Sequence, residues 1–106
     1  MPVLVLALVL APSCATSREL LISEDAYSAA FQAGLRTAKS LGYVPKKVDE
    51  RTRLMTVEKV CGCSELLVRY EPQPQGRVRV SFSGTALFGA FHDDVPRIRA
   101  AIAAAR

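Results

Sequence analysis

The stretch RVRVSFS, residues 77–83, decides the fold of this 106-residue chain. Apolar and polar residues alternate along it without a break, and the apolar set comprises Val78, Val80 and Phe82. Such alternation is typical of a β-strand that buries one face and leaves the other in water. It predicts a half-buried strand whose outer face carries Arg77 and Arg79.

Three more strand-like segments precede this one, at residues 43–48, 54–60 and 66–71. The turns between them are short, and short connections favour antiparallel neighbours. Pro45 lacks a backbone N–H group, so the first of these strands is expected at an edge of the sheet. The segments together predict a four-stranded antiparallel meander.

Helices are expected on both sides of this meander in the chain. Ser23 is a suitable N-cap for a helix over residues 24–41, where apolar residues recur at helical spacing. Gly42 would end that helix, and a final helix should begin near Asp93. The predicted fold class is α+β, in the order α-β-β-β-β-α, with both helices packed on one face of the sheet.

Size and charge restrict the kind of function. A length of 106 residues predicts a single domain. The net charge of +4 favours anionic partners such as lipid headgroups. The chain has no tract rich in Lys or Arg and only 7% aromatic residues, so no nucleic-acid partner is expected.

The first residues predict export. Residues 3–11 are apolar and uncharged, and they are too short to span a bilayer, which takes about 20 residues. They have the length of the apolar segment of a signal peptide. We expect residues 1–13 to be a cleaved signal peptide, while an N-terminal strand of a cytosolic domain is the alternative.

The pair Ser13-Cys14 resembles the end of a bacterial lipoprotein signal peptide, where a small residue precedes the cysteine that is lipidated. This resemblance implies lipid attachment at Cys14 and anchoring to a membrane of the cell envelope. Because Ala15 is not a residue that retains such proteins at the inner membrane, it also implies the outer membrane, facing the periplasm. Residues 14–22 would be a short tether and residues 23–106 the single domain. Secretion without a lipid is the alternative.

The order of elements from Ser23 onward, with Gly42-Tyr43 where the helix meets the first strand, resembles small envelope lipoprotein domains of the helix-grip type. Repeated domains of an outer-membrane-assembly lipoprotein are one example. The resemblance implies a fold and an assembly or binding role, but it assigns no site residue.

Cys61-Gly62-Cys63 is the least common local feature of the sequence. Two thiols so close in an exported chain are compatible with a strained disulfide, a redox pair or a soft-metal site. A structural clip or two free thiols is the reading we favour, because no second Cys pair or His cluster accompanies them. An unlipidated Cys14 would be a further candidate for pairing with either.

Two surfaces are candidates for binding. Arg69, Arg77 and Arg79, joined by Lys59 and partly offset by Glu71, are expected on the open face of the sheet, where they would meet lipid phosphates or an acidic partner. A solvated polar face is the simpler interpretation.

The second surface is the glycine-flanked apolar loop at residues 84–91. Leu87, Phe88 and Phe91 would contact a bilayer or a partner groove, or fold back over the core.

The sequence contains no recognised catalytic, phosphate-binding or metal motif, and its one histidine, His92, adjoins two aspartates that helix capping explains. We therefore expect no enzyme activity, no cofactor and no metal. The expected function is a noncatalytic, membrane-anchored binding, scaffold or assembly factor. An exported thiol-redox or soft-metal protein acting through Cys61 and Cys63 is the alternative, and a small enzyme acting through His92 is a third.

Overall fold

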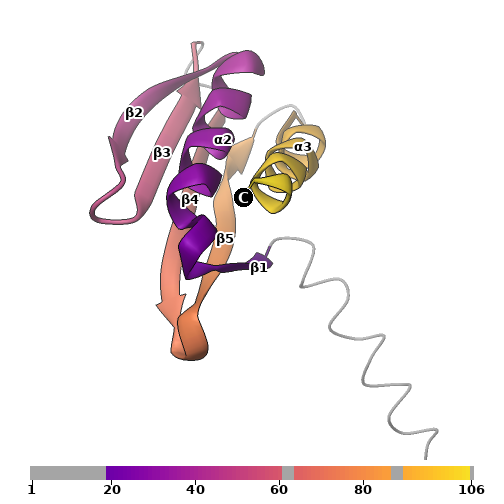
Figure 1. The fold of residues 1–106 in the computed structure, drawn as a ribbon. Helices are drawn as coiled ribbons and strands as arrows, with labels where there is room; N and C mark the ends of the chain where they lie inside the picture. The colour runs from indigo at the N-terminus through magenta and orange to yellow at the C-terminus, as the bar shows by residue number, and fades with distance from the viewer. Residues whose placement is uncertain (1–18, 61–63, 87–89, 106) are drawn as a thin grey trace, which may run out of the picture.

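Figure 1 shows a computed structural model of the chain, which describes residues 19–60, 64–86 and 90–105; for residues 85, 86 and 90–93 it describes the backbone only. The described part is α+β, as predicted. Its elements are β1 (Glu19–Ser23), η2 (Glu24–Ala26), α2 (Tyr27–Ser40), β2 (Tyr43–Asp49), β3 (Leu54–Lys59), β4 (Ser64–Gln73), η3 (Pro74–Gly76), β5 (Arg77–Ala86) and α3 (Ala90–Ala104).

The strands form one antiparallel sheet in the order β1-β5-β4-β3-β2. Strands β2 to β5 are the predicted meander, and β4 and β5 are longer than expected because their pairing continues in register from Ser64 opposite Ala86 to Gln73 opposite Arg77. The prediction of four strands is wrong, because β1 adds a fifth beside β5.

Strand β1 occupies residues that were expected to be part of a tether. Its sequence is ELLIS, and three consecutive apolar residues hide the alternation that marks a half-buried strand. The structure restores that alternation: Leu20 and Ile22 pack against the core, while Leu21 lies on the other face and is 54% exposed. The sheet therefore begins at Glu19, four residues before the expected start of the domain at Ser23.

The expected first helix is two elements. The Ser23 hydroxyl accepts a hydrogen bond from the Asp25 N–H at 3.1 Å, so it caps the short 3-10 turn η2, and α2 begins only at Tyr27. Gly42 ends the helix as predicted, with φ +95° and its N–H donating to Lys39 O at 3.0 Å. Helix α3 begins at Ala90, earlier than the predicted Asp93.

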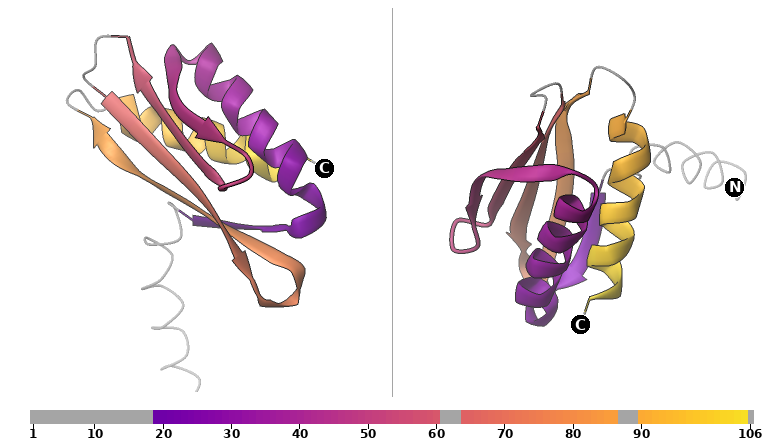
Figure 2. Two further views of the ribbon diagram at one scale, coloured as in Figure 1. Left: turned by 90° about the vertical axis from the view of Figure 1, so that its left-hand side faces the viewer. Right: turned by 90° about the horizontal axis from the view of Figure 1, so that it is seen from above.

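One hydrophobic cluster joins α2, α3 and alternate residues of the strands. The two helices lie side by side, as the views of Figure 2 show, and α2 links the two edge strands of the sheet. The largest fully buried side chains are Tyr70, Phe31, Met55, Leu66, Ile98 and Ile102. Since alternate residues of β3, β4 and β5 enter this cluster, the residues between them form the opposite face of the sheet.

Candidate functional site: the open face of the sheet

The three predicted arginines share the face of the sheet that points away from the hydrophobic cluster. Arg77 and Arg79 alternate with the fully buried Val78 and Val80, and Arg69 lies between two buried residues of β4. Arg69 and Arg77 are exposed, and Arg79 is partly so. Alternation in the sequence was enough to place these side chains correctly.

Strand register shows how the arginines are spaced. Arg79 lies opposite Glu71 and Arg77 opposite Gln73, whereas Arg69 lies opposite Ser81. Along the paired strands Arg79 is therefore two residues, and Arg77 four residues, beyond the level of Arg69, in the half of the β4–β5 pair that is nearer its turn. They form one basic region, which we call the arginine face (Arg69, Arg77 and Arg79).

Glutamates neutralise part of this side of the sheet. The Arg79 guanidinium lies 2.9 Å from the Glu71 carboxylate, which raises the pKa of Arg79. Toward the other end, Lys46 lies 2.7 Å from Glu65. Arg69 and Arg77 form no salt bridge within residues 19–60, 64–86 and 90–105, so two of the three arginines have charges that a partner could bind.

Lys59 does not belong to the arginine face, and the expectation that it does is wrong. It shares a face with Met55 and Val57, which are fully buried, so its side chain lies on the helix side of the sheet. Its ammonium group donates to Leu41 O at 2.5 Å and lies 3.5 Å from the Asp94 carboxylate. There it binds a free carbonyl at the C-terminus of α2.

Asp94 and Tyr43 complete this internal polar cluster. The Tyr43 hydroxyl donates to Asp94 Oδ2 at 2.8 Å, and both residues are buried. The Lys59 ammonium lies 4.5 Å from the centre of the Tyr43 ring. Burial, followed by the hydrogen bond to Asp94, raises the pKa of Tyr43, so its hydroxyl stays protonated and remains a donor. The cluster ties β2 and β3 to α3.

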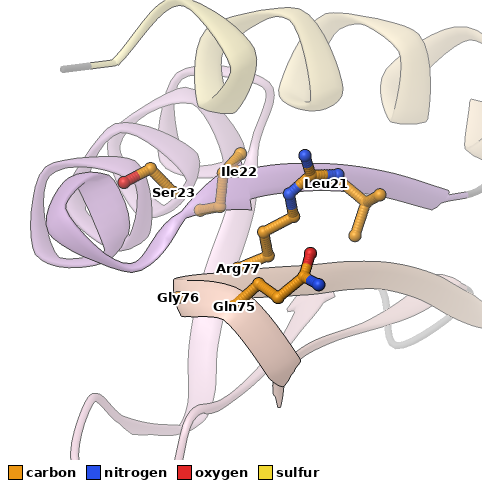
Figure 3. A pocket seen from close by; sticks show the side chains of 6 residues that line it. All are labelled: Leu21, Ile22, Ser23, Gln75, Gly76 and Arg77. Carbon is orange, nitrogen blue, oxygen red and sulfur yellow. The ribbon is translucent and has the colours of Figure 1, made fainter.

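Shallow pockets adjoin each arginine of the face. The pocket beside Arg77 measures about 350 Å³ and lies between β1 and the β4–β5 turn, and in Figure 3 the Arg77 side chain reaches from β5 toward β1. Arg79 lines a second pocket of about 430 Å³ with Leu21 and Arg99, and Arg69 lines a third of about 350 Å³ beside Leu54. The arginines thus line three separate depressions rather than one cleft.

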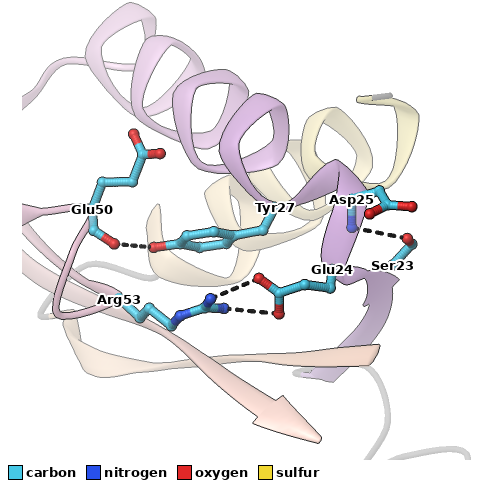
Figure 4. Close-up of polar contacts among 6 residues, drawn as sticks. All are labelled: Ser23, Glu24, Asp25, Tyr27, Glu50 and Arg53. Atoms are coloured by element: carbon cyan, nitrogen blue, oxygen red, sulfur yellow. Dashed lines mark hydrogen bonds and ion pairs between the residues drawn. The ribbon is translucent and has the colours of Figure 1, made fainter. Parts of the chain in front are cut away.

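A second polar cluster, which the sequence did not indicate, holds the start of α2 against the β2–β3 turn (Figure 4). Arg53 donates to both carboxylate oxygens of Glu24, at 2.7 and 3.3 Å, and its guanidinium lies 4.2 Å from the centre of the Tyr27 ring. The Tyr27 hydroxyl donates to Glu50 O at 2.5 Å. Burial raises the pKa of Tyr27 to about 12. These contacts join residues that are distant in the sequence, so no local sequence pattern predicts them.

Several predicted site residues lie outside the described residues. They are Cys14, Cys61, Cys63, Leu87 and Phe88. Phe91 and His92 are on the first turn of α3, where the backbone alone is described. The lipid attachment, the fate of the two neighbouring thiols and the contacts of the apolar loop therefore stay predictions.

The described residues contain no group of three or more His, Cys, Asp or Glu side chains that is placed to hold a metal ion. Among the described helices, none is long and apolar enough to cross a membrane. No protein-family model and no curated protein matches the chain. The sequence and the geometry of the sheet are therefore the basis for inferring the function.

Proposed function

We propose that this chain is a noncatalytic lipoprotein of the cell envelope, anchored through a lipid on Cys14, that binds an anionic partner with its arginine face. The observation that supports the proposal is the position of that face beside β1, the first described strand after the predicted lipid anchor. Arg77 and Arg79 on β5 pair with Ser23 and Leu21 of β1. An outer-membrane location facing the periplasm follows from the resemblance of the leader.

Chain length supports this arrangement. Residues 15–18 alone separate Cys14 from the first residue of β1. A fully extended chain advances at most about 3.5 Å per residue, so a lipid on Cys14 would hold Glu19 within roughly 18 Å of the membrane surface. Leu21 and Ser23, which pair with Arg79 and Arg77, lie two and four residues further along β1, so the short tether would keep the arginine face near the membrane.

Charge supports an anionic partner. Arg69 and Arg77 are exposed and have no ion-pair partner in the described part of the chain. A guanidinium binds phosphate and carboxylate groups through paired hydrogen bonds. Each basic residue near an anionic membrane contributes about 1 kcal/mol to binding. Acidic lipid headgroups are therefore the partner we favour, and an acidic envelope protein would use the same groups.

The first test determines whether Cys14 carries a lipid. The intact mass of the protein is measured from a membrane fraction after expression with its own leader, beside a Cys14→Ser control. A lipid-sized increase that the control lacks is the expected result. A mature protein with an unmodified Cys14, or one that keeps Met1, would overturn the anchoring.

The second test measures how much the arginine face contributes to vesicle binding, with all variants made in a Cys14→Ser background. Arg69→Gln with Arg77→Gln should lower affinity for vesicles that contain phosphatidylglycerol by roughly tenfold or more, and more strongly at low salt. Arg36→Gln with Arg97→Gln is the matched control, since both are exposed arginines on the helix layer. Equal affinities of the two pairs would refute the lipid interaction of this face.

A third comparison separates this function from the thiol alternative. Cys61→Ser with Cys63→Ser should leave vesicle binding and localisation unchanged. Loss of the protein's cellular role with its fold and anchor intact would favour redox or metal chemistry at that pair instead.

A further inference from the structure

We propose that strand β1 is a self-pairing edge: two copies of this chain join their sheets through antiparallel β1–β1 contact, centred on Leu21. This inference does not depend on lipidation, and of the arginine face it uses only Arg77. It follows from the open edge of β1, from the apolar side chains on both of its faces and from the positions of Glu19 and Arg77, which form no salt bridge with any residue that the structure describes.

Strand β1 is the last strand on its side of the sheet. It pairs with β5 alone, so its other edge carries backbone groups without a strand partner in the described part of the chain. Such an edge is a template for another strand, and proteins commonly block it with proline, lysine or a bulge. The sequence ELLIS contains no proline or lysine, and the register opposite β5 runs without a shift.

Both faces of β1 carry apolar side chains that are at least partly exposed. Leu21 is 54% exposed on the open face. On the helix face, Leu20 and Ile22 are only partly buried and line a pocket of about 240 Å³ with Ala26, Ala103 and Ala105. A second strand laid along this edge would cover Leu21 and bring apolar side chains over that pocket. This burial would provide the driving force for association.

The occupant that fits is a second β1, because its register is self-complementary. When two antiparallel copies are centred on Leu21, the two Leu21 side chains face one another, and Leu20 of each lies beside Ile22 of the other. Glu19 of each then lies opposite Ser23 of the other. The apolar side chains on both faces of β1 thus meet apolar side chains of the second copy.

This register would also bring two opposite charges, Glu19 and Arg77, close to one another. Within its own chain Ser23 pairs with Arg77, so the second copy would place its Arg77 two strands away from Glu19 on the same face. The backbones of Glu19 in one copy and Arg77 in the other would be about 10 Å apart. The small side chain of Ser23 lies between them, so the long glutamate and arginine side chains can meet above it. Neither Glu19 nor Arg77 forms a salt bridge within the described residues. Because the arrangement is two-fold symmetric, the dimer would contain two such ion pairs, each between Glu19 of one copy and Arg77 of the other.

One contact limits the edge. Arg99 of α3 donates to Glu19 O at 3.3 Å, which covers the first carbonyl of the strand. The centre of the strand around Leu21 is free of such a contact from any residue the structure describes. Pairing centred on Leu21 is therefore favoured over a register shifted toward Glu19.

The experiment is disulfide trapping in the full chain. In a background with Cys14, Cys61 and Cys63 changed to Ser, Leu21→Cys is the single thiol. Residues directly opposite in an antiparallel pair have Cα atoms about 4.5–5.5 Å apart, within the range that a disulfide accepts. Val44→Cys is the matched control, because Val44 is 42% exposed on β2, the opposite edge strand. Far-UV circular dichroism reports whether each variant keeps its sheet.

The expected result is a covalent dimer that forms at least several-fold more from Leu21→Cys than from Val44→Cys under mild oxidation. Glu19→Lys or Arg77→Glu alone should reduce trapping through Leu21→Cys, and both changes together should restore it. Equal trapping at the two cysteines would overturn the self-pairing edge. A double charge change that traps no better than the single changes would overturn the Leu21-centred register. The mass test of Cys14 is independent of either outcome, and the vesicle test stays distinguishable through Arg69, which takes no part in the proposed pairing.

Discussion

The two edge strands of this sheet differ in how they meet the rest of the molecule and the solvent. At one edge, β2 carries Pro45, and its register with β3 shifts between Pro45 and Lys47. Lys46 and Lys47 are exposed along the same strand. Proline, a register shift and lysines are features that keep an edge strand from pairing with another chain. At the other edge, β1 has none of these and exposes Leu21.

The edges also differ in their ties to the core. Tyr43 at the start of β2 is buried and bonded to Asp94 of α3, which Lys59 also approaches. Strand β1 contributes only the partly buried Leu20 and Ile22. The β2 edge is therefore tied to the core and carries features that disfavour pairing, whereas the β1 edge has fewer ties and lacks those features. The proposed self-pairing would use the edge that contributes less to the core.

The largest expected effect tests the internal tie of the β2 edge. Asp94→Leu would leave the Tyr43 hydroxyl and the Lys59 ammonium without their shared acceptor in a mostly buried site, so we expect the free energy of unfolding to fall by about 3 kcal/mol. Glu65→Leu is the control, since it removes an exposed partner of Lys46 and should cost at most about 1 kcal/mol. Urea unfolding followed by circular dichroism measures both.

If Asp94→Leu and Glu65→Leu proved equally mild, the cluster of Tyr43, Lys59 and Asp94 would not be a stabilising tie. The contrast between a fixed and an open edge would then lose its energetic basis.

A smaller effect, with opposite signs at two tyrosines, sharpens the same point. Tyr43→Phe removes the donor to Asp94 and should lower the free energy of unfolding by about 1–2 kcal/mol. Tyr70→Phe, on the central strand β4, removes a buried hydroxyl that has no hydrogen-bond partner among the described residues, so it should raise stability by up to about 1 kcal/mol. The Tyr70 hydroxyl lies beside Gly34, so its removal leaves a small void that offsets part of the gain.

The same urea experiment tests both tyrosines. Losses of equal size at Tyr43 and Tyr70 would show that ring packing, rather than the hydrogen bond to Asp94, determines the contribution of Tyr43. The pair is well matched because the substitution is chemically identical at the edge and at the centre.

The sequence predicted most of the sheet, because its signal there is local. Alternation identified β5 and the faces of Arg69, Arg77 and Arg79, and Pro45 placed β2 at an edge. Strand β1 was missed since three apolar residues in a row show no alternation, and its pairing with β5 joins residues far apart in the chain. Lys59 was assigned to the wrong face, since it alternates in step with Met55 and Val57, which are fully buried. The contacts of Arg53 and Asp94 depend on tertiary packing.

The smallest effect on stability comes from a lysine placed on each edge. Leu21→Lys and Val44→Lys both replace an exposed apolar side chain with a charge, so each should change the free energy of unfolding by no more than about 0.5 kcal/mol. Their effects on association should differ: Leu21→Lys gives the open edge the protection that β2 already has, and sedimentation velocity should show loss of self-association for this variant only. Equal behaviour of the two lysine variants would mean that the edges are equivalent in solution and that the features of β2 are not what keeps it unpaired.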